Sequence, residues 1–213
     1  MYEQEKQLML KYGLYLDRYG LITLSGGNLS MRLPDGNFLV TPSGMIYEDM
    51  NLDDFVIVDE DAKVIEGFRR PSVDTAGLLY VFKHRKDVNA VIHTHQPYAT
   101  AIGLIQDEFP CNLTTLANAA HGSVKVAPYA ATATEEFGVA AVNYLGDQLA
   151  VILKHHGLVS IGKDLKQALY ACVYTEEAAK TYYVARAMSP NVAILTQAQI
   201  DQAVDVFNHY GQK

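Results

Sequence analysis

The stretch Val88-Asn89-Ala90-Val91-Ile92-His93-Thr94-His95 is a short apolar run that ends in two histidines. Its β-branched and other apolar residues predict a buried strand. Side chains two residues apart in a strand lie on the same face, so His93 and His95 are expected side by side. Two imidazoles in this position suit adjacent coordination sites of one metal ion, although an H-x-H pattern also fits two unrelated polar residues.

A second pair of histidines follows another apolar run, residues 151–153. In His155-His156-Gly157, adjacent residues of an extended chain point in opposite directions, so at most one imidazole is expected to face the first pair. Gly157 allows close approach of the backbone. Three imidazoles and one carboxylate would hold an ion and leave room for substrate oxygens. Asp74 is the candidate carboxylate, and the alternative is an acid stabilised by the dipole of a helix start.

Helical and extended patterns alternate around these segments. The patterns predict strands at residues 29–33, 37–41, 55–58, 63–65, 88–95, 151–153 and 158–161. They predict helices at residues 8–19, 74–86, 97–105 and 164–188, and a last helix after the capping-box pair Thr196 and Gln199. Because tight hairpins join several of the strands, an α/β domain with a mixed sheet is expected and not a purely parallel one.

Two turn-forming segments could bind a phosphate group. Ser25-Gly26-Gly27-Asn28 and Thr41-Pro42-Ser43-Gly44 each offer hydroxyl groups and backbone N–H groups. Such segments bind anions locally whatever the global charge, but each could equally be an ordinary turn.

Composition limits the class of protein. A chain of 213 residues fits one domain, here residues 1–213, and its net charge of −7 argues against nucleic acid as a partner, as does the lack of any basic cluster longer than Arg69-Arg70. Cys111 and Cys172 are expected to be reduced and buried, which favours a cytoplasmic protein. No segment reads as a signal peptide, and none is long and apolar enough for a membrane span.

Taken together, these segments resemble the class II aldolase/adducin family over residues 20–210. The motifs that carry the resemblance are Gly26-Gly27-Asn28-Leu29-Ser30, Thr41-Pro42-Ser43-Gly44, Pro71-Ser72-Val73-Asp74-Thr75, His93-Thr94-His95 and His155-His156-Gly157-Leu158. The resemblance implies a three-layer α/β/α domain around a mixed, largely antiparallel sheet. It also implies a homotetramer whose active sites are shared between subunits.

The resemblance further implies a metal-dependent aldolase. Such an enzyme cleaves a ketose 1-phosphate, such as L-fuculose 1-phosphate, to dihydroxyacetone phosphate and a small aldehyde through a metal-stabilised enediolate. The implied ligands of Zn²⁺, or of Mn²⁺ or Co²⁺, are His93, His95 and His156, with Asp74 at the acidic position. The implied phosphate-binding residues are Asn28, Ser43, Gly44 and Ser72, and Tyr210 would donate a proton across a subunit interface.

The chain departs from the family pattern at three positions. Val73 replaces a serine hydroxyl beside the phosphate, and Thr114 stands where the family's L-fuculose-1-phosphate aldolase has a tyrosine. Asn118 stands where the family's L-ribulose-5-phosphate 4-epimerase has a catalytic aspartate. Asp74-Thr75 is similar to the epimerase, so an L-ribulose-5-phosphate 4-epimerase is the alternative. A third reading is a non-enzymatic domain like the adducin head, which the three histidines and the acid disfavour.

Overall fold

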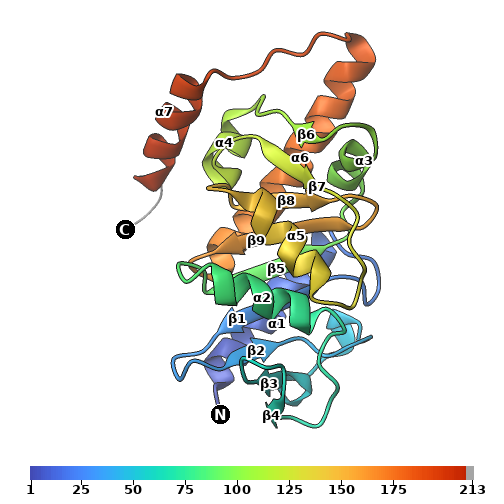
Figure 1. The fold of residues 1–213 in the computed structure, drawn as a ribbon, viewed down its shortest axis with the longest axis vertical. Helices are drawn as coiled ribbons and strands as arrows, with labels where there is room; N and C mark the ends of the chain where they lie inside the picture. Colours follow the sequence, from blue (N-terminus) through green and yellow to red (C-terminus); the bar gives the residue numbers. More distant parts are fainter. Residues whose placement is uncertain (210–213) are drawn as a thin grey trace.

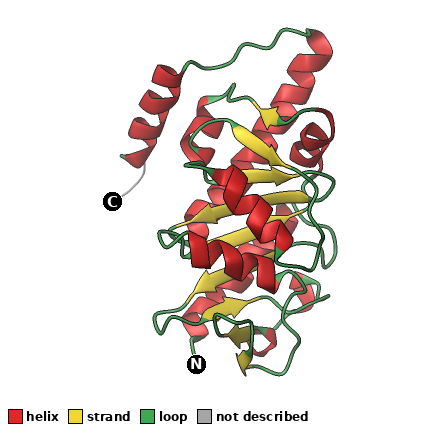
Figure 2. Ribbon diagram, in the orientation of Figure 1, coloured by secondary structure: helices red, strands yellow, loops and turns green. Residues whose placement is uncertain are grey.

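The computed structural model describes residues 1–209, and its centre is a nine-stranded β-sheet with helices on both faces (Figures 1 and 2). The strand order is β4-β3-β2-β1-β5-β9-β8-β7-β6, and every neighbouring pair is antiparallel except β7 and β8. The strands are β1 Asn28–Arg32, β2 Phe38–Val40, β3 Val56–Val58, β4 Val64–Glu66, β5 Ala90–Thr94, β6 Glu108–Phe109, β7 Val124–Ala127, β8 Ala150–Leu153 and β9 Gly157–Gly162. The expected mixed, largely antiparallel sheet is therefore confirmed.

Helices form the two outer layers. They are α1 Glu3–Arg18, α2 Thr75–His84, α3 Pro97–Ile105, α4 Thr114–Ala120, α5 Glu136–Leu145, α6 Leu165–Met188 and α7 Gln197–Asn208, with short 3-10 turns η1 Tyr47–Asp49 and η2 Leu52–Asp54. In Figure 1, α2 and α5 lie in front of the sheet, and α1 and α6 lie behind it. The three-layer α/β/α architecture is confirmed.

The pleat of each strand separates two hydrophobic cores. Ile92 and Ile152 lie in the core shared with α1, α3, α4 and α6, whereas Val91 and Val151 lie in the core shared with α2 and α5. Alternate residues of one strand thus serve opposite faces of the sheet. His93, two residues after Val91, projects toward the α2 and α5 side.

Most helix ends lie where the sequence predicts them. The side chain of Asp164 accepts a hydrogen bond from the backbone N–H of Gln167 over 2.7 Å, and Thr196 and Gln199 form the expected capping box. For α1, the helix begins at Glu3, before the predicted start at residue 8. Its buried residues are Lys6, Met9, Gly13 and Leu16, and Gly13 packs directly on the buried ring of Tyr47.

Four elements between residues 106 and 150 were not predicted. β6 has two residues, and α4 has the sequence TTLANAA, whose single large apolar side chain gives no helical period. Helix α5 carries Gly138, which disfavours a helix from sequence alone. In the structure Gly138 lies against the backbone of Gly77 in α2, and a Cβ at Gly138 would lie 2.2 Å from the Gly77 oxygen. The close crossing of α2 and α5 therefore requires Gly138, and this glycine is also the residue that weakens the sequence-based prediction of helix α5.

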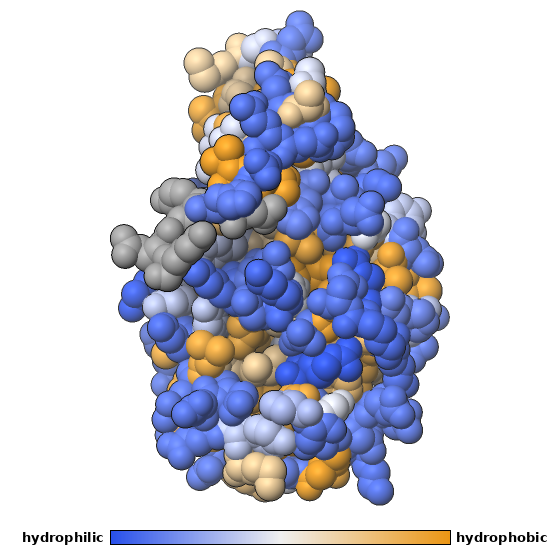
Figure 3. All heavy atoms as spheres, turned by 90° about the vertical axis from the view of Figure 1, so that its left-hand side faces the viewer, coloured by the Kyte–Doolittle hydropathy of each residue, from blue (hydrophilic) through white to orange (hydrophobic). Residues whose placement is uncertain are grey.

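The described residues have a mostly hydrophilic face around α7 (Figure 3) and two buried, reduced cysteines. Figure 3 shows the side on which α7 lies, where hydrophilic side chains cover most of the face and hydrophobic ones are scattered among them. Cys111 and Cys172 are buried and unbridged, as expected. In residues 1–209, no helix has both the length and the apolar character of a membrane span.

Candidate metal centre and active site

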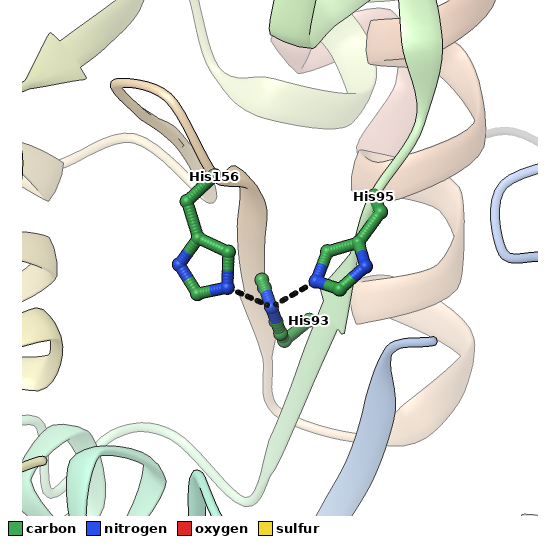
Figure 4. Close-up of side chains that lie close together, drawn as sticks. All are labelled: His93, His95 and His156. Atoms are coloured by element: carbon green, nitrogen blue, oxygen red, sulfur yellow. Dashed lines mark hydrogen bonds between the residues drawn. The ribbon is translucent and has the colours of Figure 1, made fainter. Parts of the chain in front are cut away.

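Three imidazole rings converge beside the end of β5 (Figure 4). His93 comes from β5, His95 from the residue after that strand, and His156 from the turn before β9. The Nε2 atom of His93 lies 3.1 Å from Nε2 of His95 and 3.1 Å from Nε2 of His156. One nitrogen from each ring lies within 4.8 Å of the others. Antiparallel pairing of β5 and β9 thus brings together residues that lie 63 positions apart.

The position of His93 in the sheet determines which of its nitrogens carries the proton. Nδ1 of this fully buried ring lies 2.9 Å from the carbonyl oxygen of Leu158 in β9. A carbonyl oxygen only accepts hydrogen bonds, so Nδ1 is the donor and Nε2 carries a lone pair. That single lone pair faces two other ring nitrogens and cannot accept a good hydrogen bond from both.

A divalent cation suits this donor set. Two nitrogens bound to Zn²⁺ at about 2.0–2.1 Å in tetrahedral geometry are about 3.3–3.4 Å apart, and the two His93 separations of 3.1 Å are close to that value. The carbonyl of Leu158 holds the His93 tautomer that a metal ligand needs. The residues present therefore fit a metal ion.

The pKa shifts of the three rings favour their neutral, ligating form. Burial lowers the pKa of His93 well below the usual value, and the neighbouring His156 and His95 lower it further. Burial also lowers the pKa of His95 and of His156, while the carboxylate of Asp74 acts in the opposite direction on both. Neutral imidazoles are the state in which histidine binds a metal.

The structure brings His156, and not His155, to the cluster. The reason differs from the alternation expected for an extended chain, because residues 154–156 form a turn between β8 and β9. His155 has a φ of 61° in the left-handed region, and this residue is exposed. The turn directs the His156 ring into the cluster.

Asp74 lies beside the cluster, in contact with Asn28. The Nδ2 group of Asn28 donates to Oδ2 of Asp74 over 2.9 Å, and the backbone N–H of Ala133 donates to Oδ1 over 3.3 Å. Asn28 pairs directly with His93 between β1 and β5. The clustered donor atoms come from the three imidazoles and do not include Asp74. Asp74 is buried, at 8% exposure, at the edge of the histidine cluster.

The candidate phosphate-binding residues lie on two neighbouring loops and at the start of β1. The backbone N–H of Ser43 donates to Arg70 O over 2.9 Å, and that of Ser72 donates to Thr41 O over 3.0 Å. These bonds join the loop of residues 41–44 to the loop that carries Ser72 and Asp74. Ser43 and Gly44 are exposed, and Oδ1 of Asn28 is buried with no hydrogen-bond partner among the described residues. The exposed Ser43 and Gly44 can therefore donate hydrogen bonds from the loop joined to the one that carries Asp74, whereas Oδ1 of Asn28 can only accept them.

The other positions singled out in the sequence lie elsewhere. Val73 is 61% exposed, between Ser72 and Asp74. Thr114 and Asn118 belong to α4, which packs on α6 and α7. Tyr210 lies outside the described residues.

Two participants were missed from the sequence. The ring of Phe137, in α5, lies 6.1 Å from that of His93 and 6.2 Å from that of His156, measured between centroids. It shields one side of the cluster. The other is the backbone N–H of Ala133, which binds Asp74. A backbone donor leaves no signature in the sequence, and Phe137 has none beyond its apolar character.

Comparison with known proteins gives one consistent family. The model of the class II aldolase and adducin N-terminal domain matches residues 7–183. A Bacillus thuringiensis protein named 5-deoxy-D-ribulose 1-phosphate aldolase is 31% identical over 212 residues, 99% of each chain. A Salmonella paratyphi C protein named L-ribulose-5-phosphate 4-epimerase is 34% identical over 200 residues, 87% of this chain and 86% of the relative.

A solved structure of similar shape points the same way. The structure of an L-fuculose 1-phosphate aldolase superposes with a TM-score of 0.89 at 30% identity, over 95% of each chain.

Proposed function

The chain belongs to the class II aldolase and adducin family, and on that premise we propose that it cleaves a ketose 1-phosphate to dihydroxyacetone phosphate and a small aldehyde. Membership and the aldolase-named relatives make it a sugar-phosphate aldolase, a carbon–carbon lyase. The observation that carries the proposal is the convergence of three imidazole nitrogens beside the Asn28–Asp74 pair. This pairing offers a cation site and a proton acceptor in one place.

His93, His95 and His156 would hold the metal ion. Three imidazoles suit Zn²⁺, and Mn²⁺ or Co²⁺ could substitute. When bound, the ion supplies a positive charge that stabilises the enediolate left when the carbon–carbon bond breaks. Phe137 packs against the rings of His93 and His156 and limits the access of water to that side.

Asp74 would move the proton of the substrate hydroxyl. Its Oδ2 is held by the Asn28 amide and its Oδ1 by the Ala133 N–H, so the carboxylate has a fixed orientation. Fixed orientation is what an efficient general base requires. Asn28, Ser43, Gly44 and Ser72 would bind the phosphate through hydroxyl, amide and backbone N–H groups.

Tyr210 would protonate the oxygen of the departing aldehyde from a neighbouring subunit. This role rests on the family resemblance, as does the homotetramer that it requires. A phenol near neutral pH is protonated, since its ordinary pKa is about 10. It can therefore donate a proton to the alkoxide that develops.

The second candidate is an L-ribulose-5-phosphate 4-epimerase. The 34% identity to the epimerase relative and the pair Asp74-Thr75 favour it. Asn118 disfavours it, because an amide cannot ionise and so cannot replace a catalytic aspartate. Both reactions begin with the same bond cleavage, but only an aldolase releases the aldehyde.

A substrate panel separates the two reactions. Metal-replete protein is incubated with L-fuculose 1-phosphate, 5-deoxy-D-ribulose 1-phosphate and L-ribulose 5-phosphate. Released dihydroxyacetone phosphate is trapped by reduction with NADH and a coupling dehydrogenase. We expect NADH oxidation with at least one ketose 1-phosphate. Conversion of L-ribulose 5-phosphate to its 4-epimer, with no NADH oxidation from any substrate, would contradict the aldolase assignment.

A further inference from the structure

His95 is the exposed member of the histidine cluster, and among the described residues its ring has one hydrogen-bond contact, between its Nε2 and Nε2 of His93 over 3.1 Å. His93 differs, because it is fully buried and its Nδ1 donates to Leu158. The His95 ring packs between two glycines. A Cβ at Gly26 would lie 3.0 Å from its Nδ1, and one at Gly157 would lie 3.1 Å from its Cδ2. Such contacts limit the rotation of the His95 ring, but the position of the ring depends on the backbone of residues 94–96.

Gln96 ties this backbone to α6. Its buried side chain accepts hydrogen bonds from Thr94 Oγ1 over 2.7 Å and from Cys172 Sγ over 3.0 Å, and it donates to the Cys172 carbonyl over 3.3 Å. Burial raises the pKa of the Cys172 thiol to about 12, so the thiol keeps its proton and donates. Three hydrogen bonds, one with Thr94 and two with Cys172, therefore hold the side chain of Gln96 in place.

Glu176 makes the second link between α6 and this segment. Its two carboxylate oxygens accept hydrogen bonds from the backbone N–H groups of Tyr98, over 3.0 Å, and Ala99, over 2.9 Å. These groups are at the start of α3, where backbone N–H groups lack partners within the helix. Glu176 is 1% exposed, and the nearby ammonium group of Lys180 pairs with Glu177 instead.

Capping a helix with a buried carboxylate has a large free-energy cost, because the charge is removed from water. Burial raises the pKa of Glu176, against the two backbone N–H groups that favour its ionised form. Its two hydrogen bonds to the first N–H groups of α3 offset part of the cost of that burial. Cys172 and Glu176 are four residues apart in α6 and so lie on one face of the helix.

We propose that Gln96 and Glu176 are positioning residues for His95: together they attach the segment that follows β5 to one face of α6 and so hold the His95 imidazole at the metal centre. Neither side chain makes a hydrogen bond to the three imidazoles. Both act through the backbone on either side of Pro97, the first residue of α3. This inference rests on the proposed metal centre.

The test is metal affinity, measured apart from catalysis. Zn²⁺ dissociation constants are obtained by chelator competition for the wild-type protein and for Glu176→Gln. The glutamine has the same shape, but its amide group can accept only one of the two backbone N–H bonds. We expect affinity to fall about 10–100-fold, the range for partners that support a ligand from outside the coordination sphere. At saturating Zn²⁺, turnover should recover in large part.

Thr175→Val is the matched control. Thr175 is fully buried in α6 next to Glu176, but its hydroxyl bonds only to Ala171 O of the same helix. This variant should lose thermal stability and keep Zn²⁺ affinity within about 2-fold. Equal weakening of Zn²⁺ binding in both variants would overturn the inference, since general loosening of α6 would then explain it.

A milder pair of variants keeps the test decisive if Glu176→Gln does not fold. Cys172→Ala removes the thiol donor to Gln96, and Cys172→Ser restores a donor. We expect weaker Zn²⁺ binding in the first and recovery in the second. Unchanged affinity in folded Glu176→Gln, or in Cys172→Ala if that variant alone folds, would overturn the inference. A wild-type protein that binds no divalent ion would instead contradict the proposed function.

Discussion

Nδ1 of His93 lies 2.9 Å from the carbonyl oxygen of Leu158, two residues beyond His156. The same turn and strand thus supply one imidazole of the cluster and the acceptor that sets the tautomer of another. Because the lone pair of His93 Nε2 then faces the other two rings, the three side chains form one donor set.

The first prediction distinguishes the two adjacent histidines. His156→Ala should abolish stoichiometric binding of a divalent ion, since it removes one of three converging nitrogens. His155→Ala should leave one ion per chain, because His155 is an exposed turn residue. Elemental analysis after dialysis measures both. Equal metal loss in the two variants would show that His155 also supports the site.

The second prediction separates acid–base chemistry from metal binding at Asp74. Asp74→Asn should lower turnover about 10²–10⁴-fold, the usual contribution of a general acid or base. The metal content should stay near one ion per chain, because the three clustered donors remain. Turnover and metal content are measured on the same preparation. Loss of the metal in parallel with activity would make Asp74 a ligand, and near-normal turnover would remove it from the mechanism.

The sequence is most informative where chemistry and periodicity agree. The histidine strand, the hairpin that joins the strands predicted at residues 29–33 and 37–41, and the helix predicted at residues 164–188 each have a local signal, and each is present in the structure. The convergence of His156 on His93 depends on β5 and β9 being neighbours, which no local pattern encodes. The motif order of a known family supplied that information.

Other features could not be predicted because their signals are weak or opposed. Gly138 weakens the helical pattern of α5, yet α5 supplies Phe137 to the histidine cluster. Asp74 accepts a hydrogen bond from the backbone N–H of Ala133, a residue with a φ of 58°. An alanine in the sequence predicts neither this backbone conformation nor this hydrogen bond. Such contacts depend on tertiary packing and are seen only in three dimensions.

The third prediction concerns pH and the loop that carries the phosphate candidates. Asp54 Oδ2 accepts from Asn51 N–H over 2.7 Å, and its Oδ1 accepts from Arg69 Nε over 2.8 Å. These bonds lower the pKa of Asp54, the backbone bond most of all. A lowered pKa gives stability that is present above the unfolded value of about 4 and is lost as pH falls through the folded value.

Asp54→Asn should therefore reduce the free energy of unfolding at pH 7 by about 1–2 kcal/mol, below the upper range for charged hydrogen bonds because the Arg69 side chain is 44% exposed. The difference from the wild-type protein should shrink below about pH 4. Urea unfolding at several pH values measures it. A difference that stays constant down to pH 3 would show that the charge of Asp54 is not the source.

The fourth prediction tests the hydroxyl that Val73 lacks. Val73 is exposed between Ser72 and Asp74, so Val73→Ser should add a donor without disturbing the core. KM for the ketose 1-phosphate should fall about 2–10-fold, the effect of one hydrogen bond, and cleavage of the unphosphorylated ketose should not change. Val64→Ser, at an exposed position on β4, is the control. It should change neither KM for the ketose 1-phosphate nor the rate of cleavage of the unphosphorylated ketose. Equal gains for both substrates would mean that Val73 does not face the phosphate.

The last prediction places Tyr210 in a neighbour's active site. Tyr210→Phe removes the proposed proton donor and keeps the ring, so turnover should fall about 10²–10⁴-fold with metal content unchanged. If the donor comes from another subunit, its loss can be complemented. Chains with Tyr210→Phe, which keep only this residual turnover, are therefore unfolded and refolded together with His93→Ala chains, which lack the metal centre.

Some sites of the mixed oligomer then pair an intact histidine cluster with an intact neighbouring tyrosine, so part of the activity should return. Mixing His93→Ala with His156→Ala chains is the control, because both changes damage the same cluster and no site of either chain recovers all three histidines. Differently tagged chains prove that the oligomers are mixed. Recovery limited to the first mixture assigns the tyrosine to the adjacent subunit. Absence of recovery in proven mixed oligomers would place Tyr210 in the site of its own chain or outside the mechanism.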